Sequence, residues 1–420
     1  MIDLRLLRDD PDGLAAALAR RGLGPDDLDR IRELDERRRR LVSDLDQTRA
    51  EQNQASKAIG QASPDERQGL IDAASALKET VTSLESELRE AEAEHTAAAA
   101  RIPNLPDPEA PDGQEGDGVV LRTFGEKPTF DFTPRDHVEL MEAGDALDLQ
   151  RGAKVSGARF AYLKGEGALL EFALVRYAID VAMEHGHTPV IPPVLVREGA
   201  MYGTGFLPTD AQQIFTTRDD EYHLIGTSEV SLAAMHMDEL IDEEDLPLRY
   251  AGYSPCFRRE AGAHGKDTRG ILRVHQFEKV ELFSFVHPDA SKDEHERILS
   301  IEEEVFSGLD IHAQVVDIPV GDLGASAARK FDLEAWLPGQ EAYREITSCS
   351  NTTDYQARRL KARMRVADGD NVLVHTLNGT ALAVQRAIIA VVEQHQREDG
   401  TVVVPEKLAP YLGREVLFAR

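Results

Sequence analysis

The chain has 420 residues, of which 48 are Lys or Arg and 76 are Asp or Glu, so its formal net charge is −28. Hydrophobic residues make up 41% of the sequence and charged residues 30%, which excludes a disordered chain and a membrane protein. No run approaches the roughly 18 apolar residues of a spanning helix, and the first residues do not form an export signal. Cys256 and Cys349 are the only cysteines, so a disulfide scaffold is excluded. We expect a cytoplasmic protein, and the length favours two domains.

Two long helices with a narrow apolar stripe are predicted over residues 26–60 and 65–102, within an N-terminal domain that covers 1–102. Leu, Ile and Val recur at spacings of three, four or seven, and most other positions are charged, as in an exposed two-stranded coiled coil. Gly60 and Pro64 interrupt the pattern, so we expect the chain to reverse there into an antiparallel hairpin. About 36 residues at 1.5 Å per residue give an arm roughly 54 Å long.

Residues 103–118 are dense in Pro, Gly and acidic residues, which predicts a linker. Over 119–420 the pattern changes to short strands mixed with helices, without a regular alternation of the two. This pattern predicts an α+β domain built on an antiparallel sheet. We expect a helix over 176–186, and strands over 187–196, 222–226, 248–259 and 271–286.

Common nucleotide and metal motifs are absent from the sequence. The stretch 262–270, GAHGKDTRG, departs from a phosphate-binding P-loop because Glu260 stands at the first glycine position and Asp267 follows the lysine. The glycines at 203–205 lack the third glycine of a dinucleotide fingerprint, and no HExxH or paired CxxC motif occurs. The 262–270 stretch is compatible with a flexible basic loop that closes a hairpin.

The strand predicted over 273–283 carries a candidate ligand-binding face. Side chains alternate along a strand, so Phe277, Lys279, Glu281 and Phe283 share one side. Phe277 and Glu281 are about 13 Å apart at roughly 3.3 Å per residue, close to the span from an adenine ring to a small group on its α-phosphate. Taken alone, the strand is better explained by a Phe277 in the core and a half-exposed Glu281 at a sheet edge.

Two further segments carry candidate phosphate-binding cations. In 253–262 a strand would place Arg258 and Glu260 on one face and Arg259 on the other, although an ordinary ion pair explains this spacing too. In 377–393, Asn378 or Thr380 can cap a helix whose N-terminus favours anions. Arg386 lies about 9 Å along that helix, and its alternative role is a surface charge.

The stretch 255–283, PCFRREAGAHGKDTRGILRVHQFEKVELF, closely resembles the second signature of class II aminoacyl-tRNA synthetases in the form seen in seryl-tRNA synthetases. The segment 377–393 resembles the third signature, and 176–195 resembles the first, which builds the dimer interface in that family. GTSEV at 226–230, the segment 343–359 and the N-terminal hairpin also resemble seryl-tRNA synthetase segments. The resemblance covers essentially the whole chain and implies the class II catalytic fold with a tRNA-gripping coiled-coil arm.

The resemblance implies a ligase that activates L-serine with ATP and Mg²⁺ and transfers it to tRNA(Ser), with tRNA(Sec) as a further acceptor, in a homodimer. Arg258 would contact the α-phosphate of ATP and Arg386 the γ-phosphate, with Glu345 as the third catalytic residue and the carboxylate at Mg²⁺. The implied ATP-binding residues are Arg258, Arg259, Glu260, Val274, Phe277, Glu345, Ile346, Thr347, Ser348 and Arg386. The implied serine-binding residues are Thr227, Ser228, Glu229, Glu281 and Thr380.

The strong negative charge argues against bulk electrostatic binding of RNA, so any tRNA contact needs a local explanation. Residues 26–60 hold eight Lys or Arg against nine acids, whereas residues 65–102 hold four against nine. The first helix is therefore the less acidic of the two. We expect tRNA contacts among Arg37, Arg38, Arg39 and Arg40, with shape contributing much of the recognition.

The sequence departs from the family pattern at three places. Arg259 stands where the family commonly has a small residue, and TSE replaces TAE at 227–229. The segment AVQR at 383–386 also differs from the family, which varies at this place. Two other functions remain compatible with the resemblance. One is a paralogue that serves antibiotic self-resistance or a non-tRNA acceptor, although carrier-directed relatives usually lack the long arm. The other is a non-catalytic RNA-binding relative, which we expect to have lost residues such as Arg258 or Arg386.

Overall fold

The computed structural model describes residues 1–262, 267, 269–366 and 369–419, and the chain divides into two compact units. One unit spans Asp3–Ile102 and is helical. The other unit comprises Met1–Ile2 and Pro103–Arg420 and contains all the strands of the described chain. No helix within the described ranges is long and apolar enough to cross a membrane.

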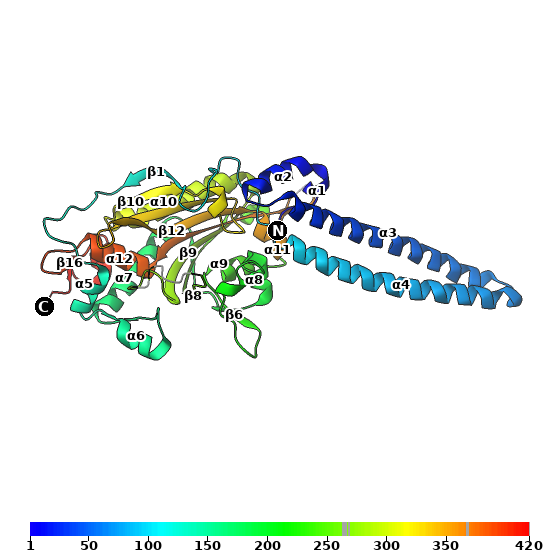
Figure 1. The fold of residues 1–420 in the computed structure, drawn as a ribbon, viewed down its shortest axis with the longest axis horizontal. Coiled ribbons are helices and arrows are strands. Elements are labelled where there is room, and N and C mark those ends of the chain that lie inside the picture. Colours follow the sequence, from blue (N-terminus) through cyan, green and yellow to red (C-terminus); the bar gives the residue numbers. More distant parts are fainter. Residues whose placement is uncertain (263–266, 268, 367–368, 420) are drawn as a thin grey trace. The chain divides into compact units, whose positions relative to one another are not determined.

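The helical unit is dominated by an antiparallel pair of long helices, α3 (Pro25–Gln61) and α4 (Pro64–Ala99), which follow α1 (Leu6–Asp9) and α2 (Pro11–Arg20). Both long helices begin with proline, whose missing N–H costs nothing in a first turn. They lie side by side along their length (Figure 1), and ion pairs join Arg37 to Glu94 and Arg49 to Glu85. The predicted coiled-coil hairpin is confirmed, and the chain reverses just after Gly60.

The apolar stripe is best buried in the half of the hairpin that is nearer its two open ends. Leu28, Ile31, Leu34, Leu41 and Leu45 are buried on α3. On α4 the buried positions are Val81, Ala91, His95 and Ala99, so most of its leucines are only partly covered. Toward the turn the apolar residues of the stripe are only partly buried. In a pair of helices each side chain is covered only by the partner helix, and its other sides remain open.

The second unit is built on an eight-stranded sheet whose neighbouring strands are antiparallel except for β4 and β8. The predicted antiparallel α+β architecture is therefore confirmed. In spatial order the strands are β1 (Val119–Phe124), β10 (Ala313–Asp317), β11 (Arg329–Leu337), β12 (Ala342–Thr353), β15 (His375–Ala383), β9 (Gln276–Val286), β8 (Leu248–Phe257) and β4 (Thr188–Val190).

Three helices, α7 (Glu166–Glu184), α10 (Ser291–Gly308) and α12 (Val384–Gln394), pack with the sheet into the main hydrophobic core. The alternation predicted for β9 is observed: Val280 and Leu282 enter this core, whereas Lys279 and Glu281 face the opposite side. Gly379 lets α10 approach β15 closely, since a Cβ there would lie 2.3 Å from Ile298. These helices cover one face of the sheet with apolar side chains, and part of the opposite face carries polar residues such as Lys279 and Glu281.

Smaller elements surround the sheet. Helices α8, α9 and α11 cover part of the face opposite the main core. The remaining helices are α5 (His137–Ala143), α6 (Leu149–Ser156), α8 (Glu198–Thr204), α9 (Glu229–Ala234), α11 (Tyr355–Leu360), α13 (Ala409–Leu412) and the 3₁₀ turns Ala211–Gln213, Glu243–Asp245, Pro288–Ala290 and Val320–Asp322. The remaining strands are β2 (Leu147–Asp148), β3 (Tyr162–Leu163), β5 (Leu195–Arg197), β6 (Tyr222–Leu224), β7 (Leu240–Asp242), β13 (Arg363–Arg365), β14 (Val372–Leu373), β16 (Val402–Val403) and β17 (Val416–Leu417).

Three local predictions were wrong. The strand expected over 187–196 is two short strands, because consecutive prolines at 192 and 193 cannot donate to a ladder. The strand that enters the 262–270 loop ends at Phe257, so Arg258, Arg259 and Glu260 follow it instead of alternating along it. Of that loop, residues 263–266 and 268 lie outside the described residues.

The third error concerns Asn378 and Thr380, which do not cap a helix. Both lie in β15, where Asn378 pairs with Ser350 and Thr380 pairs with Glu281. Helix α12 starts only at Val384, and its N-cap residue Ala383 makes no side-chain cap bond. Because β15 is hydrogen-bonded to β12 on one side and to β9 on the other, strand pairing outweighs the tendency of Asn and Thr to cap a helix.

The segment 103–118 has no regular secondary structure, yet it belongs to the second unit and is hydrogen-bonded to the rest of it. The backbone N–H groups of Asn104 and Asp107 donate to Ala325 and Ala328, each at 2.8 Å, and Val320 donates to the carbonyl of Pro111. Ala110 is buried. The composition of this stretch prevents regular secondary structure, but backbone hydrogen bonds to other segments still satisfy its N–H and C=O groups.

Candidate active site

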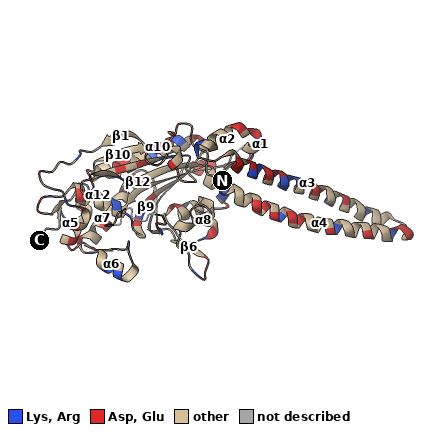
Figure 2. Cartoon of the chain, in the orientation of Figure 1, with Lys and Arg blue, Asp and Glu red and all other residues tan. Residues whose placement is uncertain are grey.

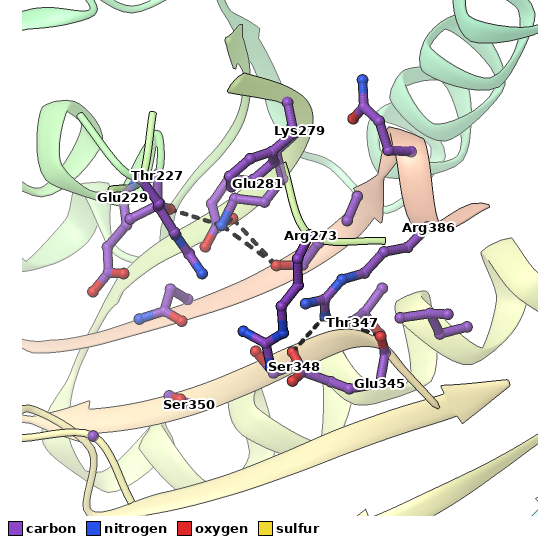
Figure 3. Close-up of a pocket in the computed structure, with 18 of the residues that line it drawn as sticks. Thr227, Glu229, Arg273, Lys279, Glu281, Glu345, Thr347, Ser348, Ser350 and Arg386 are labelled. Carbon is purple, nitrogen blue, oxygen red and sulfur yellow. Dashed lines mark hydrogen bonds and ion pairs between the residues drawn. The ribbon is translucent and has the colours of Figure 1, made fainter. Parts of the chain in front are cut away.

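A cleft of about 240 Å³ lies over the polar side of β9, β12 and β15. It is lined also by Arg258, by residues 271–274 and by the first turn of α12, which contributes Arg386. Figure 3 shows Thr227, Glu229, Lys279 and Glu281 grouped in one part of the cleft, and Glu345 and Arg386 in another. We name these two parts the carboxylate end and the arginine end.

Lys279 organises the carboxylate end. Its Nζ donates to Thr227 Oγ1 at 2.7 Å and to Thr380 Oγ1 at 3.4 Å, and it forms an ion pair with Glu281. An ammonium group has three donors, so these contacts use its full capacity. All four side chains are buried, and the charges of Lys279 and Glu281 compensate each other away from water.

Glu229 is a second buried acid at the carboxylate end, and no ion pair involves it in the part of the chain that the structure describes. Burial, followed by the nearby charge of Glu281, raises the pKa of Glu229 to about 7. Burial also raises the pKa of Glu281, although Lys279 opposes this shift. The carboxylate end therefore has one compensated acid and one acid that lacks a cation.

Glu345 and Arg386 form the arginine end. Arg386 Nη1 lies 3.0 Å from Glu345 Oε1 and donates to the Glu345 carbonyl at 2.9 Å. Burial alone would raise the pKa of Glu345, but the charges of Arg386, Lys330 and Arg258 outweigh it and lower that pKa to about 2. Glu345 is therefore ionised at neutral pH, and Arg386 is oriented by two contacts.

A β-bulge in β12 explains why neighbouring residues reach the cleft. The register with β11 skips Ile346, so that Glu345 pairs with Glu334 and Thr347 with Leu333. The hydroxyl of Thr347 donates to the buried Glu302 at 2.9 Å. Bulges commonly redirect side chains beside active sites, and here Glu345 and Ser348 both line the cleft.

Arg258 and Phe277 form a flat cationic and aromatic surface between these groups. The Arg258 guanidinium lies 5.3 Å from the centre of the Phe277 ring, and its Nε donates to the Gly226 carbonyl at 3.1 Å. Glu260, in the left-handed region with φ of 49°, is 3.2 Å from Arg273. An aromatic face beside a fixed guanidinium suits a planar base joined to a phosphate.

The structure brings most of the sequence-predicted site residues into this one cleft. Two of them do not line it. Ser228 is buried and bonds to Ser254 Oγ at 2.7 Å, and Arg259 lies with its guanidinium 5.9 Å from the Phe215 ring. The predicted residues that line the cleft are Thr227, Glu229, Arg258, Glu260, Val274, Phe277, Glu281, Glu345, Ile346, Thr347, Ser348, Thr380 and Arg386.

Sequence reasoning missed three cations of the cleft. Lys279 was placed on the correct face of β9 but was not assigned a role, although its position between Phe277 and Glu281 was a usable signal. Arg273 and Lys330 also line the cleft. Arg273 follows the 262–270 loop, and Lys330 lies on β11, where no motif in the sequence pointed to it.

The arginine end fits a magnesium ion only as part of a complex with phosphate. Mg²⁺ commonly keeps several waters and binds one or two carboxylates together with substrate phosphates. Within the described ranges no group of three or more His, Cys, Asp or Glu side chains could hold a metal. The ionised Glu345 supplies the single carboxylate that such a complex needs.

Basic and acidic residues both occur along α3 and α4 (Figure 2). The four predicted tRNA-binding arginines of α3 differ in their partners. Arg37 pairs with Glu94, whereas Arg38 and Arg39 both pair with Asp35, at 3.1 and 3.0 Å. Arg40 is exposed and has no ion pair among the residues described. Arg40 is therefore the cation of this group whose charge is least compensated.

Comparisons with known proteins cover both units. Residues 1–106 match the family model of the seryl-tRNA synthetase N-terminal domain, and residues 214–395 match that of the tRNA synthetase class II core domain (G, H, P, S and T). The serine--tRNA ligase of Acidothermus cellulolyticus is 54% identical over 417 residues, and serine--tRNA ligase 1 of Streptomyces avermitilis is 52% identical over 422 residues, with 99% of each chain covered.

Solved structures give the same result. The seryl-tRNA synthetase of Pyrococcus horikoshii, complexed with ATP, superimposes with a TM-score of 0.93 at 40% identity over 99% of both chains. The cytoplasmic serine-tRNA ligase of Naegleria fowleri, in complex with AMP, gives 0.88 at 32% identity over 99% of this chain and 98% of that one.

Proposed function

The chain belongs to the seryl-tRNA synthetase family, and on that premise we propose that its cleft activates L-serine with ATP and that the seryl group is then transferred to the 3′ end of tRNA(Ser). The observation that carries this proposal is the division of one cleft into a buried carboxylate end and an arginine end. The first end suits a small polar amino acid, and the second suits a nucleotide triphosphate. We further propose that the protein acts in the cytoplasm and that tRNA(Sec) is a second acceptor.

In the first reaction the carboxylate of serine attacks the α-phosphorus of ATP, and the bond from that phosphorus to pyrophosphate breaks. The products are seryl-adenylate and pyrophosphate. Phosphoryl chemistry of this kind depends on positioning and on stabilising charge, with little covalent help from the protein. Arg258 would contact the α-phosphate and Arg386 the γ-phosphate, because a guanidinium fork matches phosphate oxygens. When bound, Mg²⁺ would neutralise phosphate charge beside Glu345.

The nucleoside would lie on the aromatic side of the cleft. Phe277 would stack on the adenine ring, and Glu260 and the backbone of Val274 would contact its edge. Ile346, Thr347 and Ser348 continue the same wall beside Glu345. Arg259 is proposed to act near ATP only through the loop that it precedes, because it does not line the cleft.

Serine would be recognised by its polar groups. Glu281 and Thr380 would bind the hydroxyl, and Thr227 and Glu229 would lie nearby. Ser228 would support the segment 227–229 through its hydrogen bond to Ser254. Alanine would leave these buried groups unpaired, and a site of this kind rejects such an analogue by on the order of 10⁴-fold.

In the second reaction a hydroxyl of the terminal adenosine of tRNA attacks the acyl carbonyl, and AMP leaves. No histidine lines the cleft among the described residues. We assign no general base to this step.

We propose that α3 contacts tRNA through Arg37, Arg38, Arg39 and Arg40, with Arg40 as the least compensated of them. We also propose a homodimer. Exposed apolar side chains on the second unit include Val155, Leu169, Phe172 and Ile191, the last of which is 85% exposed. Single exposed apolar residues are ordinary on protein surfaces, so the proposed homodimer rests on the resemblance of 176–195 to the first signature, which builds the dimer interface in the family.

The decisive experiment is charging of purified tRNA with each of several labelled amino acids. We expect incorporation of serine only, and only with ATP. Formation of seryl-adenylate without charged tRNA would instead favour a paralogue that serves another acceptor. Binding of tRNA without adenylate formation would favour a non-catalytic relative.

A further inference from the structure

Gln356 is a fully buried residue of α11 that does not line the cleft but contacts a residue that does. Its Nε2 donates to Glu229 Oε1 at 2.6 Å and to the Thr204 carbonyl at 3.2 Å. These contacts connect Glu229, at the start of α9, to the end of α8. No other side chain of the described chain has a hydrogen bond to the Glu229 carboxylate.

The orientation of the Gln356 amide is set by its surroundings. Its Oε1 accepts hydrogen bonds from Thr376 Oγ1 at 2.9 Å and from Thr352 Oγ1 at 3.4 Å. The Thr204 carbonyl can only accept, so a reversed amide would place its oxygen against that oxygen and against the Glu229 carboxylate. The donor directed at Glu229 is therefore fixed by the protein before any substrate binds.

The Glu229 carboxylate depends on the hydrogen bond from Gln356 because of the groups around it. It is buried beside Glu281 and lacks an ion pair in the described part of the chain, whereas Glu281 is compensated by Lys279. Serine carries one cation, its ammonium group, and its carboxylate is consumed in the reaction with ATP. The uncompensated Glu229 is the acid that matches this ammonium.

We propose that Gln356 is a positioning residue for serine: its amide holds the Glu229 carboxylate in the orientation that receives the substrate ammonium. This inference rests on the proposed function of the cleft. Within the described part of the chain, the Gln356 side chain bonds to Glu229, Thr204, Thr352 and Thr376 and to none of the residues of the arginine end, so its effect should fall on serine and not on ATP.

The first test is Gln356→Met in the full-length chain, measured by serine-dependent ATP–pyrophosphate exchange. Loss of a hydrogen bond to a charged group predicts a KM for serine raised by about 10- to 100-fold. The KM for ATP should stay within about twofold. Gln394→Met is the matched control, because Gln394 is also buried and its Nε2 donates at 3.0 and 2.8 Å, but only to the backbone of His312 and Trp336.

The second test, Gln356→Glu, keeps the shape and the acceptor for Thr376. A buried acid at this position can donate to Glu229 only while the pair holds one proton, since two adjacent carboxylates resist ionising together. We expect a KM for serine near that of the wild type at low pH, which rises as the pH increases and the proton is lost. A purely structural role for Gln356 would raise the KM for serine and the KM for ATP alike at every pH.

The outcomes are distinguishable. A wild-type chain without serine-dependent exchange overturns the proposed function and this inference with it. If the wild type is active, an unchanged KM for serine in Gln356→Met overturns the inference alone. Equal increases in the KM for serine and for ATP, or a Gln356→Glu profile parallel to that of the wild type, also overturn it.

Discussion

Glu345 and Arg386 meet at 3.0 Å in the cleft although they come from β12 and α12 and are 41 residues apart in the chain. The Glu345 carbonyl accepts a second hydrogen bond from the same guanidinium nitrogen. Arg386 is therefore oriented before a nucleotide arrives, which reduces the entropy that binding must otherwise remove.

This orientation predicts that Arg386→Lys is not a conservative change. Lysine keeps the charge but loses the planar fork. Arg386 can hold Glu345 through Nη1 and leave its other nitrogens for a phosphate, whereas a single ammonium nitrogen would have to serve both partners from one position. We expect a decrease of about 10²-fold in kcat/KM for ATP in pyrophosphate exchange. The KM for serine is the internal control, and an unchanged kcat/KM for ATP would contradict the assignment of Arg386.

Glu281→Ala should abolish serine-dependent pyrophosphate exchange. The change removes the partner of Lys279 and leaves a buried ammonium uncompensated. We expect a loss of roughly 10³-fold or more in kcat/KM for serine. Retained exchange with an unchanged preference for serine over alanine would show that Glu281 does not recognise the hydroxyl.

Activity should depend on pH through Glu229. Because its pKa is raised to about 7, Glu229 is protonated and neutral below that pH and loses its attraction for the serine ammonium. We expect log kcat/KM for serine to rise by about one per pH unit below pH 7 and to level off above it, since kcat/KM reports the free enzyme. Glu229→Gln, which cannot ionise, should have a lower value and lose this dependence.

Substitution of the α3 arginines should weaken tRNA binding and leave adenylate formation unchanged. Replacing Arg37, Arg38, Arg39 and Arg40 together by Ser should raise the KM for tRNA and leave pyrophosphate exchange unchanged. Among single changes, Arg40→Ser should have a larger effect than Arg39→Ser, because Arg39 is already paired with Asp35. Unaltered charging kinetics in the fourfold variant would remove these residues from the tRNA-binding surface.

Phe283→Ala should destabilise the second unit without changing a residue that lines the cleft. Phe283 is fully buried and packs edge-on against Phe285, with ring centroids 5.1 Å apart. Truncating a buried aromatic residue costs about 3–5 kcal/mol, which urea unfolding would measure. Val372→Ala, at a partly exposed position, should cost about 1 kcal/mol or less.

The features predictable from sequence were those with a local period or a long motif. The spacing of three and four residues along 26–60 and 65–102 predicted α3 and α4, and the alternation along β9 placed Lys279 and Glu281 on one face. Both periods follow from the geometry of a single helix or strand, so no distant contact is needed to detect them. The family resemblance supplied the expected ligands, and the comparisons confirm the family.

Only the tertiary structure decided which side chains meet. Thr380 is a strand residue opposite Glu281 because β15 pairs with β9, about a hundred residues away, and not because of its own preference. The bulge at Ile346, the contacts of Lys279 with Thr227 and Thr380, and the contact of Gln356 with Glu229 likewise depend on register and packing between separate elements. A strand can shift its register by one residue and reverse every side chain, so the sequence of one segment does not specify its partners.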